Sequence, residues 1–244
     1  MSLILVTGAS AGLGFLTATS LVDAGHNVVL HARNPHRITQ PNVLSRVHGT
    51  VYGDLSDDDQ TRRVAEEANQ FGRFDAVIHN AGVIEGPELV GVNVVAPYLL
   101  TALMGRPKRI IVLSSSMHRS GSPHRLRTEV FSGHNAITYS DSKLYVTALA
   151  LCIARRWPDV LAHAVDPGWV PTRMGGPSAT DDLTEGHRTQ EWLATADATS
   201  VRPHTGGYWH HGKTQRPHPA ANDPAIQHEL LTVLEATTGV FLAP

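Results

Sequence analysis

Cysteine, lysine and long apolar runs are scarce in this sequence. A single cysteine, Cys152, excludes an internal disulfide and a metal site built from several thiolates. The longest apolar run, 145–154, is about half the length that a helix needs to cross a bilayer. The formal net charge of −2 gives no broad attraction for nucleic acid or an anionic membrane. We therefore expect no nucleic-acid partner and no membrane partner, and a reducing, cytoplasmic location.

The composition is that of an ordinary globular domain. Hydrophobic residues make up 41% and charged residues 17% of the 244 positions, enough to bury one sizeable core. No linker or internal repeat divides the chain, and residues 1–7 lack the basic segment of a targeting signal. We expect a single domain over residues 1–244.

Short β-rich segments alternate with longer helical ones along most of the chain. Strands are expected at 3–6, 27–32, 46–52, 74–79, 109–113, 160–165 and 206–209. Helices are expected at 13–24, 57–71, 88–104, 138–157, 182–196 and 224–236. The crossover 33–45 contains Pro35 and Pro41, which leave little room for a regular helix. This alternation predicts an α/β fold, a Rossmann-type doubly wound parallel sheet in a single domain.

A glycine-rich turn joins the first strand to the first helix. Gly8 permits the tight turn, Gly12 lets the backbone approach a pyrophosphate, and Gly14 allows close packing of helix on strand. The spacing differs from GxGxxG, and no Lys-Ser/Thr pair follows as in a P-loop. The alternative is a tight turn that holds no ligand.

The end of the second strand bears on the choice of dinucleotide. A NAD site has a carboxylate there for the ribose 2′-hydroxyl, whereas residues 30–34 carry none and offer Arg33 for a 2′-phosphate. The sequence therefore favours NADP(H) over NAD(H), unless Arg33 is merely a solvated surface cation.

Further motifs occur in the order found in the short-chain dehydrogenase/reductase family, which the chain resembles over about residues 2–240. They are TGxxxGxG at 7–14, Asp54-Leu55 after the third strand, His79-Asn80-Ala81-Gly82 in place of NNAG, Asn93, a serine after the fifth strand, YxxxK at 139–143, and PGxxxT at 167–172. The long stretch between Ser115 and Tyr139 is similar to the retinol dehydrogenase and carbonyl reductase branch. The stretch from Gly82 to Asn93 is shorter than usual in that branch.

The resemblance implies a set of site residues. The catalytic residues would be Asn93, Ser115, Tyr139 and Lys143. Counting residues along the strand from Arg109 favours Ser115 over Ser116. The cofactor contacts would be Gly8, Ser10, Gly12, Leu13, Gly14, Arg33, Asp54, Leu55, Asn80, Ala81, Gly82, Tyr139, Lys143, Pro167, Gly168, Val170 and Thr172. No metal is expected.

Tyr139 and Lys143 stand four residues apart, on one face of the predicted helix. An ammonium beside a phenol stabilises the phenolate, so Lys143 is expected to lower the pKa of Tyr139, which would act as general acid or base. Ser115 would donate to the substrate oxygen. The resemblance adds that Lys143 bonds the nicotinamide ribose and that Asn93 holds a water linking Lys143 to solvent.

The substrate is expected to be a small carbonyl or alcohol held by loops near 117–135 and 169–182. Apolar lining is expected from Trp169, Met174 and Tyr208, although Trp169 could equally be a packing residue. Helices 88–104 and 138–157 form oligomer interfaces in many family members, so a homo-oligomer is possible.

Two other functions stay open: a redox sensor that binds a dinucleotide without turnover, and a sugar-nucleotide epimerase or dehydratase, which shares YxxxK. A sensor needs only the phosphate-binding turn, and an epimerase usually has a larger C-terminal portion.

The sequence has 15 histidines. His204, His210, His211 and His218 lie in a segment rich in Gly and Pro. They could bind a metal, act as a pH-sensitive lid or lie on a solvated surface; adjacent His210 and His211 would point to opposite faces of a strand. Cys152 is expected to be a buried small hydrophobe.

Overall fold

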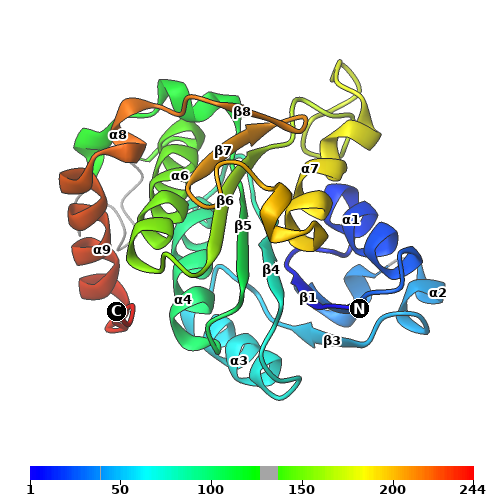
Figure 1. Cartoon of the computed structure of the whole chain (residues 1–244). Helices are drawn as coiled ribbons and strands as arrows, with labels where there is room; N and C mark the ends of the chain where they lie inside the picture. Colours follow the sequence, from blue (N-terminus) through cyan, green and yellow to red (C-terminus); the bar gives the residue numbers. More distant parts are fainter. Residues whose placement is uncertain (39, 127–136) are drawn as a thin grey trace.

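A mostly parallel sheet runs through the centre of the molecule (Figure 1). The computed structural model describes residues 1–38, 40–126 and 137–244. In this part of the chain the sheet has eight strands in the order β3-β2-β1-β4-β5-β6-β7-β8, and only β8 is antiparallel to its neighbour. The strands are β1 Leu3–Val6, β2 Asn27–Ala32, β3 Gly49–Tyr52, β4 Ala76–His79, β5 Arg109–Leu113, β6 Leu161–Asp166, β7 Gly207–His210 and β8 Lys213–Gln215.

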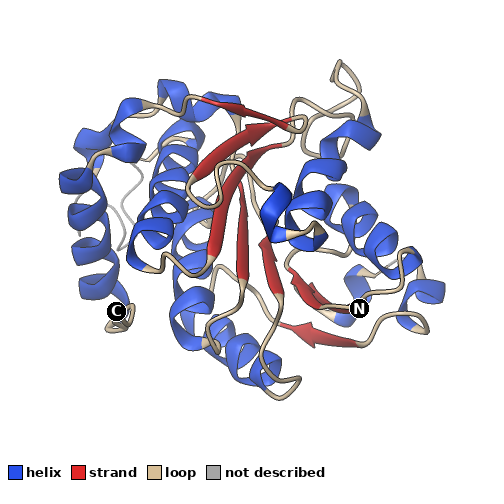
Figure 2. Ribbon diagram, in the orientation of Figure 1, coloured by secondary structure: helices blue, strands red, loops and turns tan. Residues whose placement is uncertain are grey.

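Helices cover both faces of this sheet (Figure 2). Three hydrophobic clusters fill the space between sheet and helices, one of them beneath α1 and α7 and the other two on the opposite side. The α-helices are α1 Gly12–Asp23, α2 Pro41–Leu44, α3 Asp58–Asn69, α4 Ala96–Leu103, α6 Tyr139–Arg156, α7 Leu183–Thr195, α8 Pro219–Asn222 and α9 Pro224–Thr238. The expected doubly wound α/β fold is confirmed.

Side-chain caps explain where several helices begin. Asp57, Asp182 and Asp223 accept backbone N–H bonds at the first turns of α3, α7 and α9. Thr138 and Asp141 form a reciprocal capping box at the start of α6. This capping box makes Tyr139 the first residue of α6.

The structure departs from the sequence-based elements in several places. The strand expected at 46–52 begins only at Gly49, and the short helix α8 was not expected. The single helix expected over 88–104 is a π-helical segment, η2 Gly91–Val95, followed by α4. Pro97, near the start of α4, has no N–H for the regular helical ladder. An unexpected β8 pairs with β7 through a short hairpin. As expected, the described residues of the crossover 33–45 form no long helix, but a 3₁₀ turn, η1 Pro35–Arg37, and the one-turn α2.

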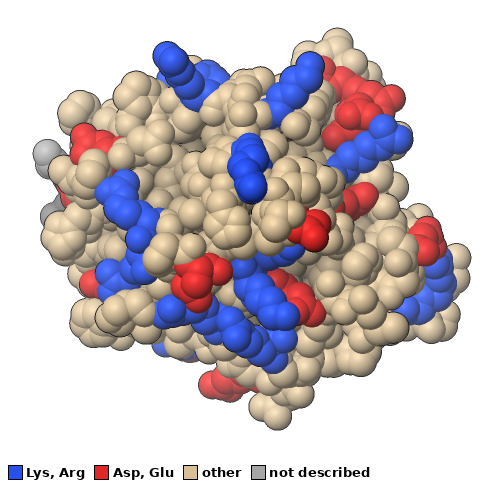
Figure 3. Space-filling view, viewed as in Figure 1, with Lys and Arg blue, Asp and Glu red and all other residues tan. Residues whose placement is uncertain are grey.

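The C-terminal helices pack on α6, whose residues from Asp141 to Ala154 are all buried. Cys152 lies in this cluster at 8% exposure, as expected for a small core residue, and burial raises the pKa of its thiol. Within the described residues, no helix is long and apolar enough to cross a membrane. Figure 3 shows basic and acidic side chains interspersed over one face.

Candidate active site

A cavity of about 460 Å³ is lined by residues at the carboxyl ends of the parallel strands, where open α/β sheets bind ligands. Its lining includes most of the sequence-predicted cofactor contacts and two of the predicted catalytic residues. The predicted residues in the lining are Gly8, Ser10, Gly12, Leu13, Gly14, Arg33, Asp54, Leu55, Asn80, Ala81, Gly82, Tyr139, Lys143, Pro167 and Thr172.

The glycine-rich turn has the shape expected of a phosphate-binding loop. Gly8 and Gly12 have φ values of +63° and +58°, a conformation that favours glycine. A Cβ on Gly8 would lie 2.8 Å from the Ala81 backbone, and one on Gly14 would lie 2.3 Å from the Asn80 amide nitrogen. No described side chain caps α1 at Ala11, so the first N–H groups of this helix are available to an anion.

Thr7 and Asn80 hold the turn against the loop after β4. The Thr7 hydroxyl accepts from the backbone N–H groups of Asn80 and Ala81, both at 3.0 Å. The Asn80 side-chain amide donates to the Thr7 carbonyl at 2.8 Å. These bonds fix the two loops relative to each other, and Thr7 was not among the predicted contacts.

Two arginines lie at the end of the cavity beyond β2. Arg33 forms an ion pair with Asp54 at 3.4 Å, and Arg37 also lines the cavity. Burial acts to raise the pKa of Asp54, but hydrogen bonds from Ser56 and the charge of Arg33 outweigh it, so the pKa is lowered. Arg37 was missed because it lies in a proline-containing turn whose direction the sequence does not reveal.

Tyr139, Lys143 and Ser115 come together at the junction of β5 and α6. The Ser115 side chain is close enough to the Tyr139 hydroxyl to act on its pKa, and Ser115 is more buried than exposed Ser116. Lys143 is 5% exposed, and its Nζ donates to the Leu113 carbonyl at 2.7 Å. This Nζ also lies 5.5 Å from the centre of the Tyr139 ring. Ser114 also lines the cavity, and its hydroxyl is bonded to that of Thr147.

The expected lowering of the Tyr139 pKa is wrong for this structure. Burial raises the pKa of Tyr139 to about 12, the neighbouring Ser115 side chain opposes this rise, and the charge of Asp166 adds to it. Burial lowers the pKa of Lys143 to about 8, while Asp166 opposes that shift. The phenol therefore keeps its proton at neutral pH in the structure as it stands.

Asn93 lies in the π-helical segment and bridges two elements. Its Oδ1 accepts from the Val83 N–H at 2.8 Å, and its Nδ2 donates to the Val83 carbonyl at 2.9 Å and to Ser142 Oγ at 3.0 Å. A Cβ on Gly82 would lie 3.4 Å from Asn93 Oδ1 and 3.5 Å from Lys143 Nζ. Asn93 thus ties the loop after β4 to α6 close to Lys143; its expected contact with water stays a prediction.

The loop after β6 completes the cavity wall. Pro167 and Thr172 line it, whereas Gly168 and the buried Val170 are absent from the lining. Gly168, with φ +83°, donates its N–H to Asp166 Oδ1 at 3.0 Å. Val170 packs beside Gly186 of α7.

A buried polar group behind the site was not found from the sequence. Asp166 is 4% exposed and accepts from the Tyr208 hydroxyl at 3.2 Å, while His210 Nδ1 lies 3.5 Å from the same carboxylate oxygen. Tyr208 is itself 2% exposed, so its expected position in the substrate lining is wrong. Its ring instead contacts buried His118, with 4.6 Å between the ring centroids.

The C-terminal histidines also differ from expectation. The rings of His210 and His211 stack with centroids 3.9 Å apart, because His211 leaves the strand with φ 45° in the β7–β8 turn. The expectation that they point to opposite faces is therefore wrong. Within the described ranges, no group of three or more His, Cys, Asp or Glu side chains is placed to hold a metal ion.

The two expected substrate loops contribute exposed apolar side chains near the site. Met117 is 48%, Trp169 53% and Met174 43% exposed, and Met174 lines the cavity. Ile84, after β4, joins the lining at 46% exposure. The part of the first loop from 127 to 135 lies outside the described residues.

Fold and site together define a dinucleotide-binding oxidoreductase scaffold: a parallel sheet, a glycine-rich turn, and a Ser-Tyr-Lys group at the carboxyl edge. The family model for short chain dehydrogenases matches residues 2–183. The chain belongs to the short-chain dehydrogenase/reductase family, and it is an oxidoreductase of that family.

Curated relatives support this assignment over nearly the whole chain. Short-chain dehydrogenase chry4 of Gibberella zeae is 36% identical, with 99% of each chain covered. Human retinol dehydrogenase 14 is 27% identical, covering 97% of this chain and 86% of that protein. The fold is similar to that of NADPH-bound carbonyl reductase from chicken fatty liver, with a TM-score of 0.69 and 21% identity over 88% of this chain and 98% of that chain.

Proposed function

We propose that the protein transfers a hydride between NADP(H) and a carbonyl or alcohol substrate, with Tyr139 as general acid or base. The observation that carries the proposal is the pair of Ser115 and Tyr139 beside Lys143, with Tyr139 and Lys143 in the wall of the cavity that starts at the glycine-rich turn. The nicotinamide would supply the hydride, and this chain supplies position and proton.

Three features of the cavity suit the phosphate groups of a dinucleotide. The start of α1 has no described side-chain cap, the glycines leave room for close backbone approach, and the far end holds Arg33 and Arg37. Asp54 and Leu55 would contact the adenine side, and Asn80, Ala81 and Gly82 the middle of the cofactor. Pro167, Gly168, Val170 and Thr172 would hold the nicotinamide side, and Asn93 would retain the water that reaches Lys143.

The protonation state of Tyr139 favours one direction of reaction. With its pKa at about 12, the phenol is neutral at physiological pH and can donate its proton to a carbonyl oxygen. Ser115 can donate to the same oxygen as negative charge develops. Reduction of a carbonyl therefore starts from the state that this structure holds.

The mouth of the site supports an apolar substrate. Ile84, Met117, Trp169 and Met174 expose large apolar side chains after three neighbouring strands. An aromatic, alicyclic or medium-chain ketone or aldehyde would bury this surface. A steady-state assay with NADPH and a carbonyl panel of increasing size tests the function: no oxidation of NADPH by any member would contradict it.

The redox-sensor alternative needs only the dinucleotide cavity. It gives no reason for placing Ser115 beside Tyr139 or for burying Lys143 next to them. An epimerase or dehydratase is disfavoured because the spacing of Gly8, Gly12 and Gly14 differs from that usual in those enzymes. As α8 and α9 cover α6, any self-association would use another surface.

We expect Arg33→Ala to weaken NADP⁺ binding by about 10- to 100-fold, since it removes a charged partner of the 2′-phosphate. NAD⁺ binding should change little, because NAD⁺ has a hydroxyl there. Titration calorimetry with each nucleotide measures both affinities. Arg63→Ala, an exposed arginine on α3, is the matched control. An unchanged ratio of the two affinities would refute the cofactor preference.

A further inference from the structure

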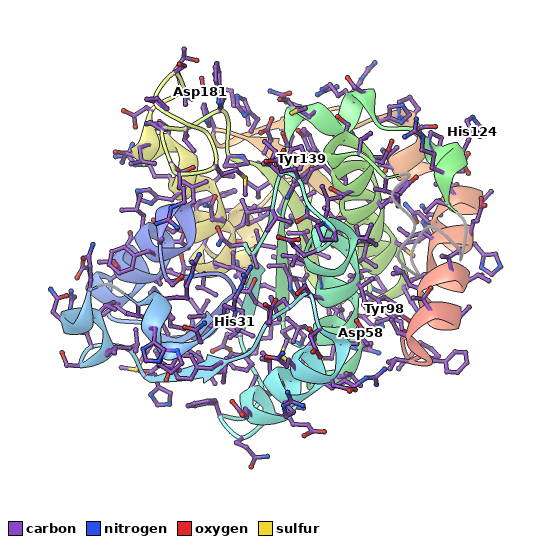
Figure 4. All side chains as sticks on the ribbon, turned by 180° about the vertical axis from the view of Figure 1, so that it is seen from behind. His31, Asp58, Tyr98, His124, Tyr139 and Asp181 are labelled. Carbon is purple, nitrogen blue, oxygen red and sulfur yellow. The ribbon has the colours of Figure 1, made fainter. Side chains whose placement is uncertain are left out.

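His31, at the end of β2, connects two parts of the cavity that are distant in sequence. Its Nδ1 lies 3.1 Å from the Gly8 nitrogen, in the glycine-rich turn. Its Nε2 lies 3.0 Å from the Gly53 carbonyl oxygen, in the segment that follows β3 and leads to Asp54. Gly8, His31 and Gly53 all line the cavity. Figure 4 shows His31 among the N-terminal elements, well apart from Tyr139.

These contacts define the form of the imidazole. A backbone N–H can only donate, so Nδ1 must accept from Gly8 and carry no proton. The single proton of the neutral ring then sits on Nε2 and is donated to Gly53. A charged imidazolium would carry a second proton on Nδ1, directly opposed to the Gly8 N–H.

The surroundings keep the ring neutral. His31 is 2% exposed, and burial lowers its pKa to about 4, against the opposing effects of the Gly53 bond and the charge of Asp54. Asp54 is itself paired with Arg33. The Gly8 bond therefore persists across the physiological pH range.

The geometry points to His31 as a positioning residue for the dinucleotide, which holds the phosphate-binding turn in the conformation that faces the cavity. This inference rests on the proposed function. Two bonds hold the turn to this residue: the Gly8 N–H donates to the ring, and the Ala9 N–H donates to the His31 carbonyl at 2.9 Å. Together they keep Gly8 at φ +63°, the conformation that directs the turn into the cavity.

Replacing His31 by asparagine or by glutamine tests its two ring contacts one at a time. His31→Asn can place an acceptor near the position of Nδ1 and keep the Gly8 bond. His31→Gln reaches the Gly53 carbonyl but places no acceptor at Gly8. We expect His31→Gln to raise the dissociation constant for NADP⁺ about 10-fold and His31→Asn to stay within about 3-fold of the unaltered protein.

The kinetic readout should separate positioning from folding. In His31→Gln the KM for NADPH should rise while kcat changes little, because the proton-transfer group is untouched. His163→Asn is the control: His163 is also buried and bonded to a backbone N–H, but it lies outside the cavity lining. It should leave NADP⁺ binding unchanged. Equal NADP⁺ affinity in the two His31 variants would overturn the inference.

Nitrogen NMR of the imidazole needs no substitution. At pH 6.5 the unaltered protein should show an unprotonated Nδ1 and a protonated Nε2 in His31. A protonated Nδ1 would overturn the inference even if the His31 variants failed to fold. Failure of the unaltered protein to bind NADP⁺ would instead overturn the proposed function, and with it this role.

Discussion

Tyr139→Phe should lower kcat by roughly 10²- to 10⁴-fold, the range that positioned proton transfer contributes to enzyme rates. The substitution removes the hydroxyl of a residue that lies beside Ser115 in the wall of the cavity. The phenyl ring that remains occupies the same space. Steady-state kinetics with NADPH and the best carbonyl of the panel would measure the loss.

The same variant should bind NADP⁺ with nearly unchanged affinity, since the glycine-rich turn and both arginines are intact. Tyr98→Phe is the matched control, because the Tyr98 hydroxyl donates to the Val240 carbonyl at 2.6 Å, outside the cavity lining. It should retain activity. A Tyr139→Phe enzyme with turnover near that of the unaltered protein would refute the assignment of Tyr139 as general acid or base.

Acidification from pH 7 to pH 5 should destabilise the fold by several kcal/mol. Among the described residues, burial lowers the pKa of His31, His79 and His163 from 6.5 to about 4. Between these values the unfolded chain binds more protons than the folded one, so stability falls as pH falls. Relative to pH 7, each of these histidines lowers the free energy of unfolding by about 2 kcal/mol at pH 5 and by about 3 kcal/mol at pH 4.

This loss is large against the roughly 5–15 kcal/mol by which proteins are stable. Urea unfolding followed by circular dichroism at pH 7, 6 and 5 would measure it. His79→Asn, which puts in place the residue usual in the family motif, should remove about a third of the pH dependence. The control is His228→Asn, at an exposed position, which should leave the pH dependence of the unfolding free energy unchanged. Equal unfolding free energies at pH 7 and pH 5 would contradict the prediction.

Local sequence patterns were sufficient to predict most of the fold. The apolar segment 109–113 is a strand with the predicted bounds, β5, because strands buried on both faces read as continuous apolar runs. The helix expected at 138–157 is α6 to within one residue at each end, since Thr138 and Asp141 supply a capping signal within four residues. The glycine-rich turn could be predicted for the same reason, because its glycines are needed by the backbone conformation of the turn itself.

Patterns of this kind could not reveal contacts between distant segments. The hairpin that stacks His210 on His211 depends on a positive φ at a residue that is not glycine. Arg37 enters the cavity only because the short crossover folds back over β2. The pKa of Tyr139 was expected to fall on the evidence of a lysine four residues away, but it depends on burial and on Asp166, more than 20 residues further along.

The sequence by itself determined the family, the doubly wound sheet and the types of residue at the site, because strand, turn and cap signals are local. The tertiary structure decided how the site residues behave. It turned Lys143 towards the Leu113 carbonyl, buried Asp166 behind Tyr139, and joined Gly8 to Gly53 through the His31 ring. Desolvation and hydrogen-bond partners set protonation states, and both arise only when segments far apart in the chain pack together.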